Sequence, residues 1–327
     1  MREWVNRTHV GDCRELLRAM ADDGVRVETC VSSPPYFGLR DYGVAGQIGL
    51  EDTPEEYVDR MVEVFRAVRD VLTSDGTLWL NLGDSYATRG GANQTPQMGN
   101  AFQRRERGKA VICRSKRLSR AGRWAGGNNP AAGGVKPKDL FGIPWRVALA
   151  LQTDGWYLRS DIIWHKPNPM PESVGDRPTK AHEYLFLLAK SERYYYDAEA
   201  IREPDSGQDH PRNVLDLREP TGGLMAPHRG IRSVEGRVGK GRNRRSVWTV
   251  PTTPFPGAHF ACFPPALIEP CILAGSPAGG TVLDPFMGSG TTAQVATRLG
   301  RKFIGCELNP KYVELHELRR TTVGMPI

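Results

Sequence analysis

The chain has 327 residues, 39% of them hydrophobic, which is enough for one large domain or two modest ones. It has 44 Lys and Arg residues against 37 acidic residues, giving a formal net charge of +7. Its apolar runs fall short of the about 18 residues of a membrane span, and its first residues lack the apolar stretch of a signal peptide, so we expect a cytoplasmic protein that contacts no membrane. The six cysteines form no C-x-x-C pair and accompany no His cluster, which argues against a disulfide framework and predicts no metal site.

The positive charge is concentrated in two segments rich in Gly and Arg. The first basic segment, Tyr86–Lys138, carries twelve Lys and Arg residues against Glu106 alone. The second basic segment, Arg229–Arg245, carries seven against Glu235, and the remainder of the chain is acidic. Such segments favour the binding of a polyanion, although solvated loops would have the same composition.

The first predicted unit consists of a strand, a helix and a second strand. Thr53 precedes Pro54 and lies three residues before Glu56, a capping-box pattern that predicts the start of a helix. The predicted elements are a buried strand at Val25–Val31, a helix from Pro54 to Leu72, a break at Asp75-Gly76 and a strand at Thr77–Leu82.

Helices and strands alternate again after the first basic segment. We expect helices at Pro144–Gly155, Pro264–Leu273, Thr291–Leu299 and Pro310–Arg320, and strands at Tyr157–Trp164, Glu183–Ala189, Thr281–Asp284 and Phe303–Cys306. The polar, Gly- and Pro-rich stretch Ile201–Arg245 predicts no element. Strands that alternate with helices predict an α/β fold with a mostly parallel sheet covered on both faces.

The first predicted strand leads into Ser33-Pro34-Pro35-Tyr36, the SPPY motif. The motif combines a hydroxyl group, a backbone stiffened by proline and an aromatic ring. These groups suit a pocket that holds one planar base with an exocyclic amine.

A second motif, Asp284-Pro285-Phe286-Met287-Gly288-Ser289-Gly290-Thr291-Thr292, lies between a predicted strand and a predicted helix. Its two glycines allow a tight turn, and the free N–H groups of the helix start favour a charged ligand. With Ala293 and with Glu307 after the next strand, it also fits the dinucleotide fingerprint. Only one strand follows, however, which is too few for an NAD fold, and no Gly-Lys-Ser/Thr follows for a phosphate loop. S-adenosylmethionine needs only one nucleoside site, which this unit can supply.

The pairing of these two motifs resembles the amino-methylating DNA methyltransferases, and the order of the motifs is similar to the β group of that family. The resemblance implies a Rossmann-like fold with a seven-stranded, mostly parallel sheet, circularly permuted so that the catalytic motif precedes the cofactor motif. Landmarks that match in the same order are LTSDGTLWLNL at 72–82, WHKP at 164–167 and HEY at 182–184.

The resemblance also assigns the site that binds S-adenosylmethionine. Asp12 would contact the adenine, Glu307 the ribose, and Phe263 and Pro264 the methionine pocket. The expected cofactor-binding residues are Asp12, Phe263, Pro264, Asp284, Pro285, Phe286, Gly288, Ser289, Gly290, Thr291, Thr292 and Glu307.

The expected catalytic residues are Ser33, Pro34, Pro35 and Tyr36. Ser33 Oγ and the Pro34 carbonyl would accept hydrogen bonds from the amine of a flipped base, Tyr36 would stack on that base, and Phe37 would contact it from the side. Family members with Ser at the first motif position mostly modify cytosine N4, so we expect N4-methylcytosine, with adenine N6 as the alternative. Transfer would be direct and in line, without a metal.

The sequence divides into five functional regions. They are a catalytic half at 1–85, a basic insertion at 86–138, a continuation of the catalytic sheet at 139–200, a variable region for target recognition at 201–250 and a cofactor-binding half at 251–327. The expected contacts to double-stranded DNA are Arg104, Arg105, Arg107, Arg114, Lys116, Arg117, Arg120, Arg123, Arg242, Arg244 and Arg245. Whether a cognate restriction endonuclease exists, and whether the chain is a monomer or a homodimer, stays open.

Several residues have a competing structural role. Cys271 follows Pro270, as does the nucleophile of cytosine C5 methyltransferases, but it precedes the glycine motif, so we expect a buried structural thiol. For His165 and His182 a structural role is favoured, while Asp41 and Asp84 would either assist at the pocket or cap turns. Two functions of other classes remain as alternatives: a DNA-binding protein without catalysis, and an NAD-dependent oxidoreductase.

Overall fold

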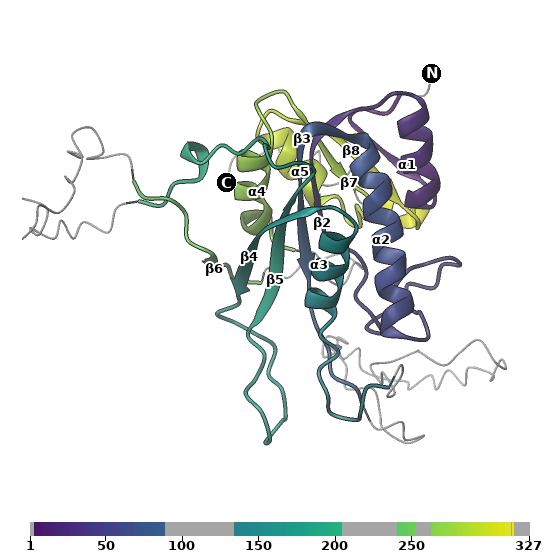
Figure 1. The fold of residues 1–327 in the computed structure, drawn as a ribbon, viewed down its shortest axis with the longest axis vertical. Helices are drawn as coiled ribbons and strands as arrows, with labels where there is room; N and C mark the ends of the chain where they lie inside the picture. The colour runs from purple at the N-terminus through teal and green to yellow at the C-terminus, as the bar shows by residue number, and fades with distance from the viewer. Residues whose placement is uncertain (1–2, 89–133, 205–240, 253–262, 315, 317–327) are drawn as a thin grey trace, which may run out of the picture.

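The computed structural model describes residues 3–88, 134–204, 241–252, 263–314 and 316 (Figure 1). The expected DNA contacts between Arg104 and Arg123 lie outside these ranges. None of the helices in the described ranges combines the length and the apolarity that a membrane crossing requires.

One sheet runs through the described part of the chain, with the strand order β1-β8-β7-β2-β3-β5-β4-β6. All neighbouring pairs are parallel except those of β5, which is antiparallel to both β3 and β4. The strands are β1 Arg7–Val10, β2 Val27–Ser32, β3 Leu72–Leu82, β4 Tyr157–His165, β5 His182–Ala189, β6 Val247–Thr249, β7 Thr281–Asp284 and β8 Lys302–Glu307. The mostly parallel sheet is confirmed.

The sheet has eight strands, so the expected count of seven is wrong for the described residues. The additional strand is β6, a three-residue edge strand that pairs with β4. It follows a polar stretch without periodicity, and three residues are too few for an alternating pattern to stand out. The circular permutation stays a prediction.

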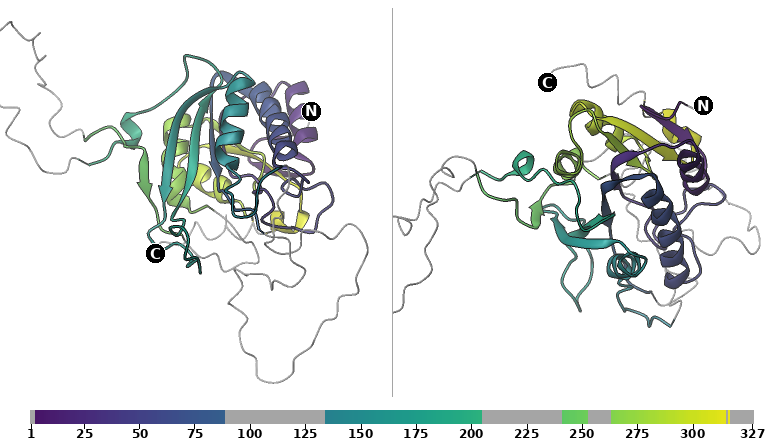
Figure 2. Two further views of the ribbon diagram at one scale, coloured as in Figure 1. Left: turned by 60° about the horizontal axis from the view of Figure 1, so that its bottom comes forward. Right: turned by 45° about the horizontal axis from the view of Figure 1, so that its top comes forward.

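Helices cover both faces of the sheet (Figure 2). On one face, α1 Cys13–Asp22, α2 Pro54–Val71 and α3 Ile143–Thr153 pack over one buried core. On the other, α4 Pro265–Gly275, α5 Thr291–Arg298 and the short helix η1 Glu199–Ile201 pack over a second core. The two cores contain almost all the buried apolar side chains, so the sheet is the rigid element to which the site is attached.

The helix α2 begins as the sequence predicts. Thr53 Oγ1 accepts a hydrogen bond from Glu56 N at 3.2 Å, and Pro54 occupies the first turn. Glu56 in turn accepts from Asp52 N at 3.1 Å. The first bond satisfies one of the N–H groups that a helix start leaves without a partner, and the second ties the residue before the cap to the first turn.

The predicted break at Asp75-Gly76 is wrong, because β3 runs through it from Leu72. The register with β2 shifts at this point, and other chain segments use the carbonyl groups: Lys190 N donates to Gly76 O at 3.0 Å and Tyr195 N donates to Asp75 O at 2.9 Å. The Asp-Gly pair, which is typical of a turn, therefore lies at a bulge within the strand.

The other predicted elements are confirmed, with ends that move by at most two residues. Residues 310–314 and 316 are helical, which agrees with the described part of the last predicted helix. The elements β1 and α1 were not predicted, since β1 is short and only His9 in it is buried.

Candidate active site

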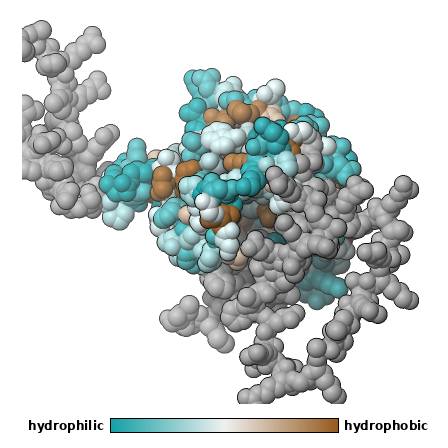
Figure 3. Space-filling model, turned by 90° about the horizontal axis from the view of Figure 1, so that it is seen from below, coloured by the Kyte–Doolittle hydropathy of each residue, from teal (hydrophilic) through white to brown (hydrophobic). Residues whose placement is uncertain are grey.

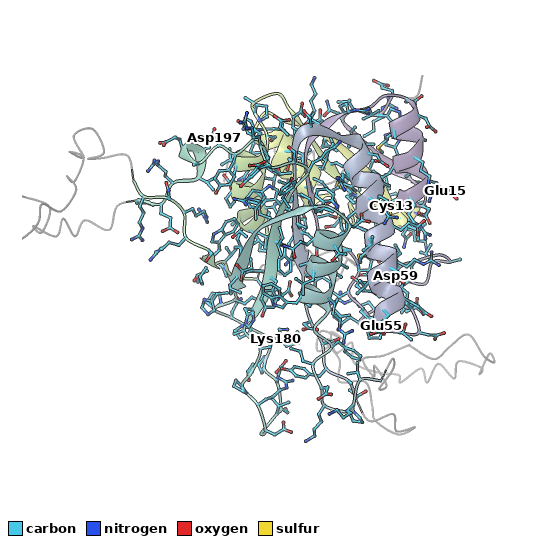
Figure 4. The ribbon with its side chains drawn as sticks, in the orientation of Figure 1. Cys13, Glu15, Glu55, Asp59, Lys180 and Asp197 are labelled. Carbon is cyan, nitrogen blue, oxygen red and sulfur yellow. The ribbon has the colours of Figure 1, made fainter. Side chains whose placement is uncertain are left out.

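The motif residues meet at one edge of the sheet, which we call the active edge. Because β1, β8, β7, β2 and β3 are parallel, their carboxyl ends share this edge, and the amino end of the antiparallel β5 joins them. Figure 4 labels Lys180 here, two residues before β5. Figure 3 looks onto this end of the molecule, where hydrophilic residues lie beside smaller apolar areas. Ligands of open α/β sheets bind at such an edge.

The two motifs are joined by a direct hydrogen bond between adjacent strands. Ser32 Oγ, at the end of β2, donates to Asp284 Oδ1, at the end of β7, at 2.6 Å. Thr292 Oγ1 donates to Asp284 Oδ2 at 2.6 Å and Phe286 N donates to Oδ1 at 3.0 Å. Burial raises the pKa of the Asp284 carboxyl to about 6. Asp284 thus holds the turn between β7 and α5 in place.

The glycine turn has the backbone conformation that the motif predicts. Gly288 has φ 53° and Gly290 has φ 84°, and Gly290 caps the start of α5. A Cβ atom at Gly290 would lie 2.8 Å from the His316 ring, so the position is restricted to glycine both by its φ and by its neighbour. His316 Nε2 also lies 2.6 Å from Gly288 O, and its Nδ1 lies 3.0 Å from Thr8 Oγ1.

Glu307 ends β8 beside this turn. Its carboxylate accepts hydrogen bonds from Gly288 N and Asn309 N, both at 2.8 Å. Burial raises the pKa of Glu307 to about 7. The predicted ribose-binding carboxylate therefore lies against the glycine turn, as a cofactor site at the ends of β7 and β8 requires.

Asp12 lies between β1 and α1, directly after Gly11, whose N donates to Glu307 O at 2.9 Å. Its carboxylate caps α1, accepting from Arg14 N at 2.8 Å, and pairs with the Arg14 guanidinium. The hydrogen bond from that guanidinium holds the pKa of Asp12 below its usual value. The predicted adenine contact is thus also the residue that starts α1.

The other predicted cofactor residues surround the same turn. Phe263 is buried in the same core cluster as Met287, and Pro264 caps α4. Ser289, Thr291 and Thr292 are buried, and Pro285 and Phe286 lie between β7 and the glycines. The structure therefore places this group of predicted residues between β7, β8 and the first residues of α4 and α5.

The SPPY motif follows β2 directly. Ser33 Oγ lies 3.3 Å from both Tyr36 OH and Asn81 Oδ1. Tyr36 OH donates to Glu183 Oε2 at 2.7 Å and also lies 3.0 Å from Asn81 Oδ1. Pro34 is buried, and Tyr57 OH donates to Pro35 O at 2.9 Å, which fixes the backbone of the motif. The four predicted catalytic residues are thus held rigidly at one place.

Gly83 and Phe37 lie beside Tyr36 and determine which aromatic side chains can reach the pocket. A Cβ atom at Gly83 would lie 2.5 Å from the Tyr36 ring, so Gly83 is needed for the ring to fit. Phe37 is 1% exposed and packs against Tyr57 and Phe141 at 5.7 and 5.3 Å between ring centroids. The expectation that Phe37 contacts the base is wrong, because its side chain belongs to the core.

Three members of the site, Asn81, Glu183 and His316, were not predicted from the sequence. Asn81 and Glu183 lie within the matched landmarks LTSDGTLWLNL and HEY, where they were interpreted as parts of strands. A polar side chain near the end of each of these buried strands is the feature of the sequence that could have identified them as site residues. His316 comes from the C-terminal helix, and no sequence pattern linked it to the glycine turn.

Both aspartates with open roles cap backbone turns. Asp84 accepts from Ile143 N at 3.2 Å and from Ser85 N at 3.0 Å, which caps α3, and burial raises the pKa of Asp84. Asp41 accepts from Gly43 N at 2.7 Å.

Structural positions are also found for the remaining residues with competing roles. Cys271 is fully buried on α4 with Sγ 3.5 Å from Leu267 O, which confirms the structural role. His165 Nδ1 lies 3.1 Å from Thr249 Oγ1 between β4 and β6. Burial lowers the pKa of His182, whose ring meets Tyr184 edge-on.

The three described arginines among the expected DNA contacts have partners within the chain. Arg242 and Arg245 both pair with Glu203 at 3.0 Å, and the Arg244 guanidinium lies 4.6 Å from the centre of the Trp248 ring. These residues precede β6, which runs parallel to β4 and points its end toward the active edge. Their contact with DNA stays a prediction.

Comparison with known proteins agrees with this geometry. A DNA methylase family, N6_N4_Mtase, matches residues 27–318. The type II methyltransferase M.SmaI of Serratia marcescens is 46% identical over 310 residues, covering 95% of this chain and 89% of its own length. M.Cfr9I of Citrobacter freundii is 46% identical over 305 residues, covering 93% of this chain and 84% of its own length.

Solved structures share the fold. The PvuII DNA methyltransferase, described as cytosine-N4-specific, superposes with a TM-score of 0.57 at 20% identity and covers 97% of this chain and 89% of its own. TTHA0409 of Thermus thermophilus, whose structure is a complex with S-adenosyl-L-methionine, superposes with a TM-score of 0.56 at 23% identity. The match covers 98% of this chain and 95% of TTHA0409. The chain therefore belongs to the DNA methylase family of N6 and N4 amino-methyltransferases, whose members take the methyl group from S-adenosylmethionine.

Proposed function

We propose that this S-adenosylmethionine-dependent DNA methyltransferase transfers the methyl group to the exocyclic N4 of cytosine in duplex DNA. The observation that carries the proposal is the hydroxyl of Ser33 at the first position of the SPPY motif, at the active edge of the sheet. Family members with Ser at this position mostly modify cytosine N4. The PvuII methyltransferase, which shares the fold, is described as cytosine-N4-specific.

The residues at the ends of β7 and β8 fit S-adenosylmethionine. The buried Glu307 carboxylate suits ribose hydroxyls, and the N–H groups at the start of α5 suit a carboxylate. A side chain at Gly290 would meet His316, so only glycine fits this turn. When bound, the cofactor supplies a methyl group on a positively charged sulfur. Asp12, Phe263 and Pro264 would hold its adenine and methionine ends.

The base has to leave the duplex to reach Ser33. The amine of cytosine is a weak nucleophile because its lone pair is delocalised into the ring. Ser33 Oγ and the Pro34 carbonyl would each accept a hydrogen bond from this amine, which turns the nitrogen toward tetrahedral geometry and frees the pair. The buried Pro34 and the bond from Tyr57 to Pro35 O would keep the acceptors in place during transfer.

Duplex DNA would bind along the active edge. We assign target recognition to residues 201–250 and phosphate contacts to the basic insertion at 86–138, with the catalytic sheet formed by 1–85 and 139–200 and the cofactor half by 251–327. The named relatives are type II methyltransferases, which makes a cognate restriction endonuclease a natural partner. Because the proposed substrate is DNA, we expect the protein to act inside the cell that produces it.

The test is to incubate the protein with sequence-diverse duplex DNA and S-adenosylmethionine, digest the DNA to nucleosides and identify the product by mass spectrometry. We expect N4-methylcytosine. N6-methyladenine would retain the family chemistry and overturn the base assignment, and the absence of any methylated base would overturn the proposed activity.

A further inference from the structure

A chain of hydrogen bonds leads away from the base pocket into the protein. It starts at Ser33 Oγ, passes Tyr36 OH at 3.3 Å and ends at Glu183 Oε2 at 2.7 Å. Glu183 is paired with Lys166, and the two side chains are 16% and 19% exposed. The chain therefore links a predicted catalytic hydroxyl to a carboxylate that is largely shielded from solvent.

The direction of these hydrogen bonds is fixed at the Glu183 end. A carboxylate paired with a lysine only accepts, so Tyr36 OH donates to it. Burial, together with the nearby Glu183 charge, raises the pKa of Tyr36 well above its usual range, so the phenol keeps its proton for this bond. Its oxygen is then left with lone pairs that accept from Ser33.

Asn81 enforces the same direction at Ser33. Its amide nitrogen donates to Tyr184 O at 3.1 Å and lies 3.3 Å from Glu183 Oε2. This turns Asn81 Oδ1 toward Ser33, where it is an acceptor for the Ser33 hydroxyl. Both neighbours of the Ser33 hydroxyl therefore offer it an acceptor, and with its one proton directed to either of them the Ser33 Oγ lone pairs are left to accept from an incoming amine.

Methyl transfer to an amine leaves one proton too many. The N–C bond forms as the S–C bond breaks, and the new methylammonium nitrogen must lose a proton to give the neutral product. The Asp84 carboxylate is engaged elsewhere: its Oδ1 accepts from Ile143 N and Ser85 N, and its Oδ2 lies 3.9 Å from Lys180 Nζ. The chain from Ser33 to Glu183 offers a continuous route.

We propose that Glu183 is the terminal proton acceptor of this reaction and the positioning residue that orients the Ser33 hydroxyl. The proton of the methylated amine passes to Ser33 Oγ, the Ser33 proton passes to Tyr36, and the Tyr36 proton passes to the Glu183 carboxylate. The products are the neutral methylamine, the thioether left by the cofactor and a neutral Glu183. This inference rests on the proposed amino-methylation, although it holds for cytosine N4 and adenine N6 alike.

The experiment is a double-mutant cycle on the full chain with Glu183→Gln, Tyr36→Phe and the double variant. The single-turnover rate is measured at saturating DNA and S-adenosylmethionine, and the binding of each is titrated separately. We expect each single variant to lose about 10²-fold in rate, as for loss of a proton-transfer group, with unchanged affinity for S-adenosylmethionine. The double variant should lose no more than either single one, because both break the same chain.

Two features of the design separate this role from a structural one. Tyr36→Phe removes one oxygen and keeps the ion pair of Glu183 with Lys166, so it tests the chain even where Glu183→Gln destabilises the fold. Glu269→Gln makes the same change at the Glu269–Arg298 ion pair between α4 and α5 and should leave the rate unchanged.

The outcomes distinguish this inference from the proposed function. A wild-type enzyme that methylates DNA while Glu183→Gln reacts at the same rate overturns the route through Glu183 alone. Losses that multiply in the double variant show independent roles and overturn it as well. A wild-type enzyme that methylates no base overturns the proposed function and the proton route with it.

Discussion

Ser32 Oγ donates a 2.6 Å hydrogen bond to Asp284 Oδ1, across 252 residues of sequence. Ser32 directly precedes the SPPY motif, and Asp284 begins the glycine motif. Both side chains are buried, at 1% exposure each, so the bond is shielded from water. The SPPY motif and the glycine motif are therefore joined by a bond between two side chains as well as by the pairing of β2 with β7.

Asp284 should make stability depend on pH. Its pKa is raised by burial from 3.8 to about 6, so the folded chain holds this proton more tightly than the unfolded chain. The contribution is full below about pH 4 and is lost as the pH rises through about 6. We expect Asp284→Asn, which keeps the shape, to remove about 2 kcal/mol of the change in unfolding free energy between about pH 4 and pH 7. Urea unfolding of the cofactor-free protein measures it; an unchanged dependence would place the titration elsewhere.

Gly290→Ala should weaken binding of S-adenosylmethionine. The new Cβ would lie 2.8 Å from His316 and the φ of 84° is unfavourable for alanine, so the turn has to move. We expect at least a tenfold loss of affinity by calorimetric titration, which corresponds to about 1.4 kcal/mol. Gly300→Ala is the matched control, since Gly300 has φ 71° but no atom within 4 Å of its added Cβ. Equal losses in both variants would mean that backbone strain alone, and not the contact with His316, is responsible.

Ser33→Ala should abolish most methyl transfer and leave cofactor binding intact. In the proposed mechanism the Ser33 hydroxyl accepts from the reacting amine, so its removal should lower the single-turnover rate by about 10²- to 10³-fold, as for other preorganised polar groups. Ser191→Ala, at a hydroxyl bonded to Ser74 O and Arg193 O, provides a control away from the site. Activity that survives in Ser33→Ala would remove this residue from the catalytic role.

Deletion of residues 101–123 should weaken DNA binding and flatten its salt dependence. The segment carries nine Lys and Arg residues against Glu106. Each contact to a phosphate that is lost should lower the slope of log affinity against log salt by about 0.9. The affinity for S-adenosylmethionine should not change. Filter binding across a salt series is the measurement, and a slope equal to that of the full chain would exclude a phosphate clamp.

Much of the fold follows from local patterns in the sequence. The start of α2 at Thr53 and Pro54 and the turn at Gly288 and Gly290 depend on neighbouring residues, and the structure confirms both. The strand through Asp75-Gly76 could not be predicted, because it depends on donors from Lys190 and Tyr195, more than 100 residues away. Short β6 exists only through its pairing with β4.

The position of the candidate site could be predicted where its residues form a contiguous motif. Ser33 to Tyr36 and Asp284 to Thr292 lie together at the active edge as expected. Asn81, Glu183 and His316 were missed because each reaches the motifs through the tertiary fold from a separate element. The expectation for Phe37 was wrong because it rested on the place of this residue beside Tyr36, which carries a polar OH group. The Phe37 side chain has no polar group to keep it out of the core.

Because β2 and β7 are neighbours in the sheet, the spacing of these strands also sets the distance between the SPPY motif and the glycine motif. Neighbouring strands lie about 4.8 Å apart, a spacing set by their hydrogen bonds and insensitive to side chains. The SPPY motif follows β2 and the glycine motif follows β7, so the pairing of these strands holds the two motifs side by side. The segments outside the sheet can therefore lengthen or shorten without altering this separation.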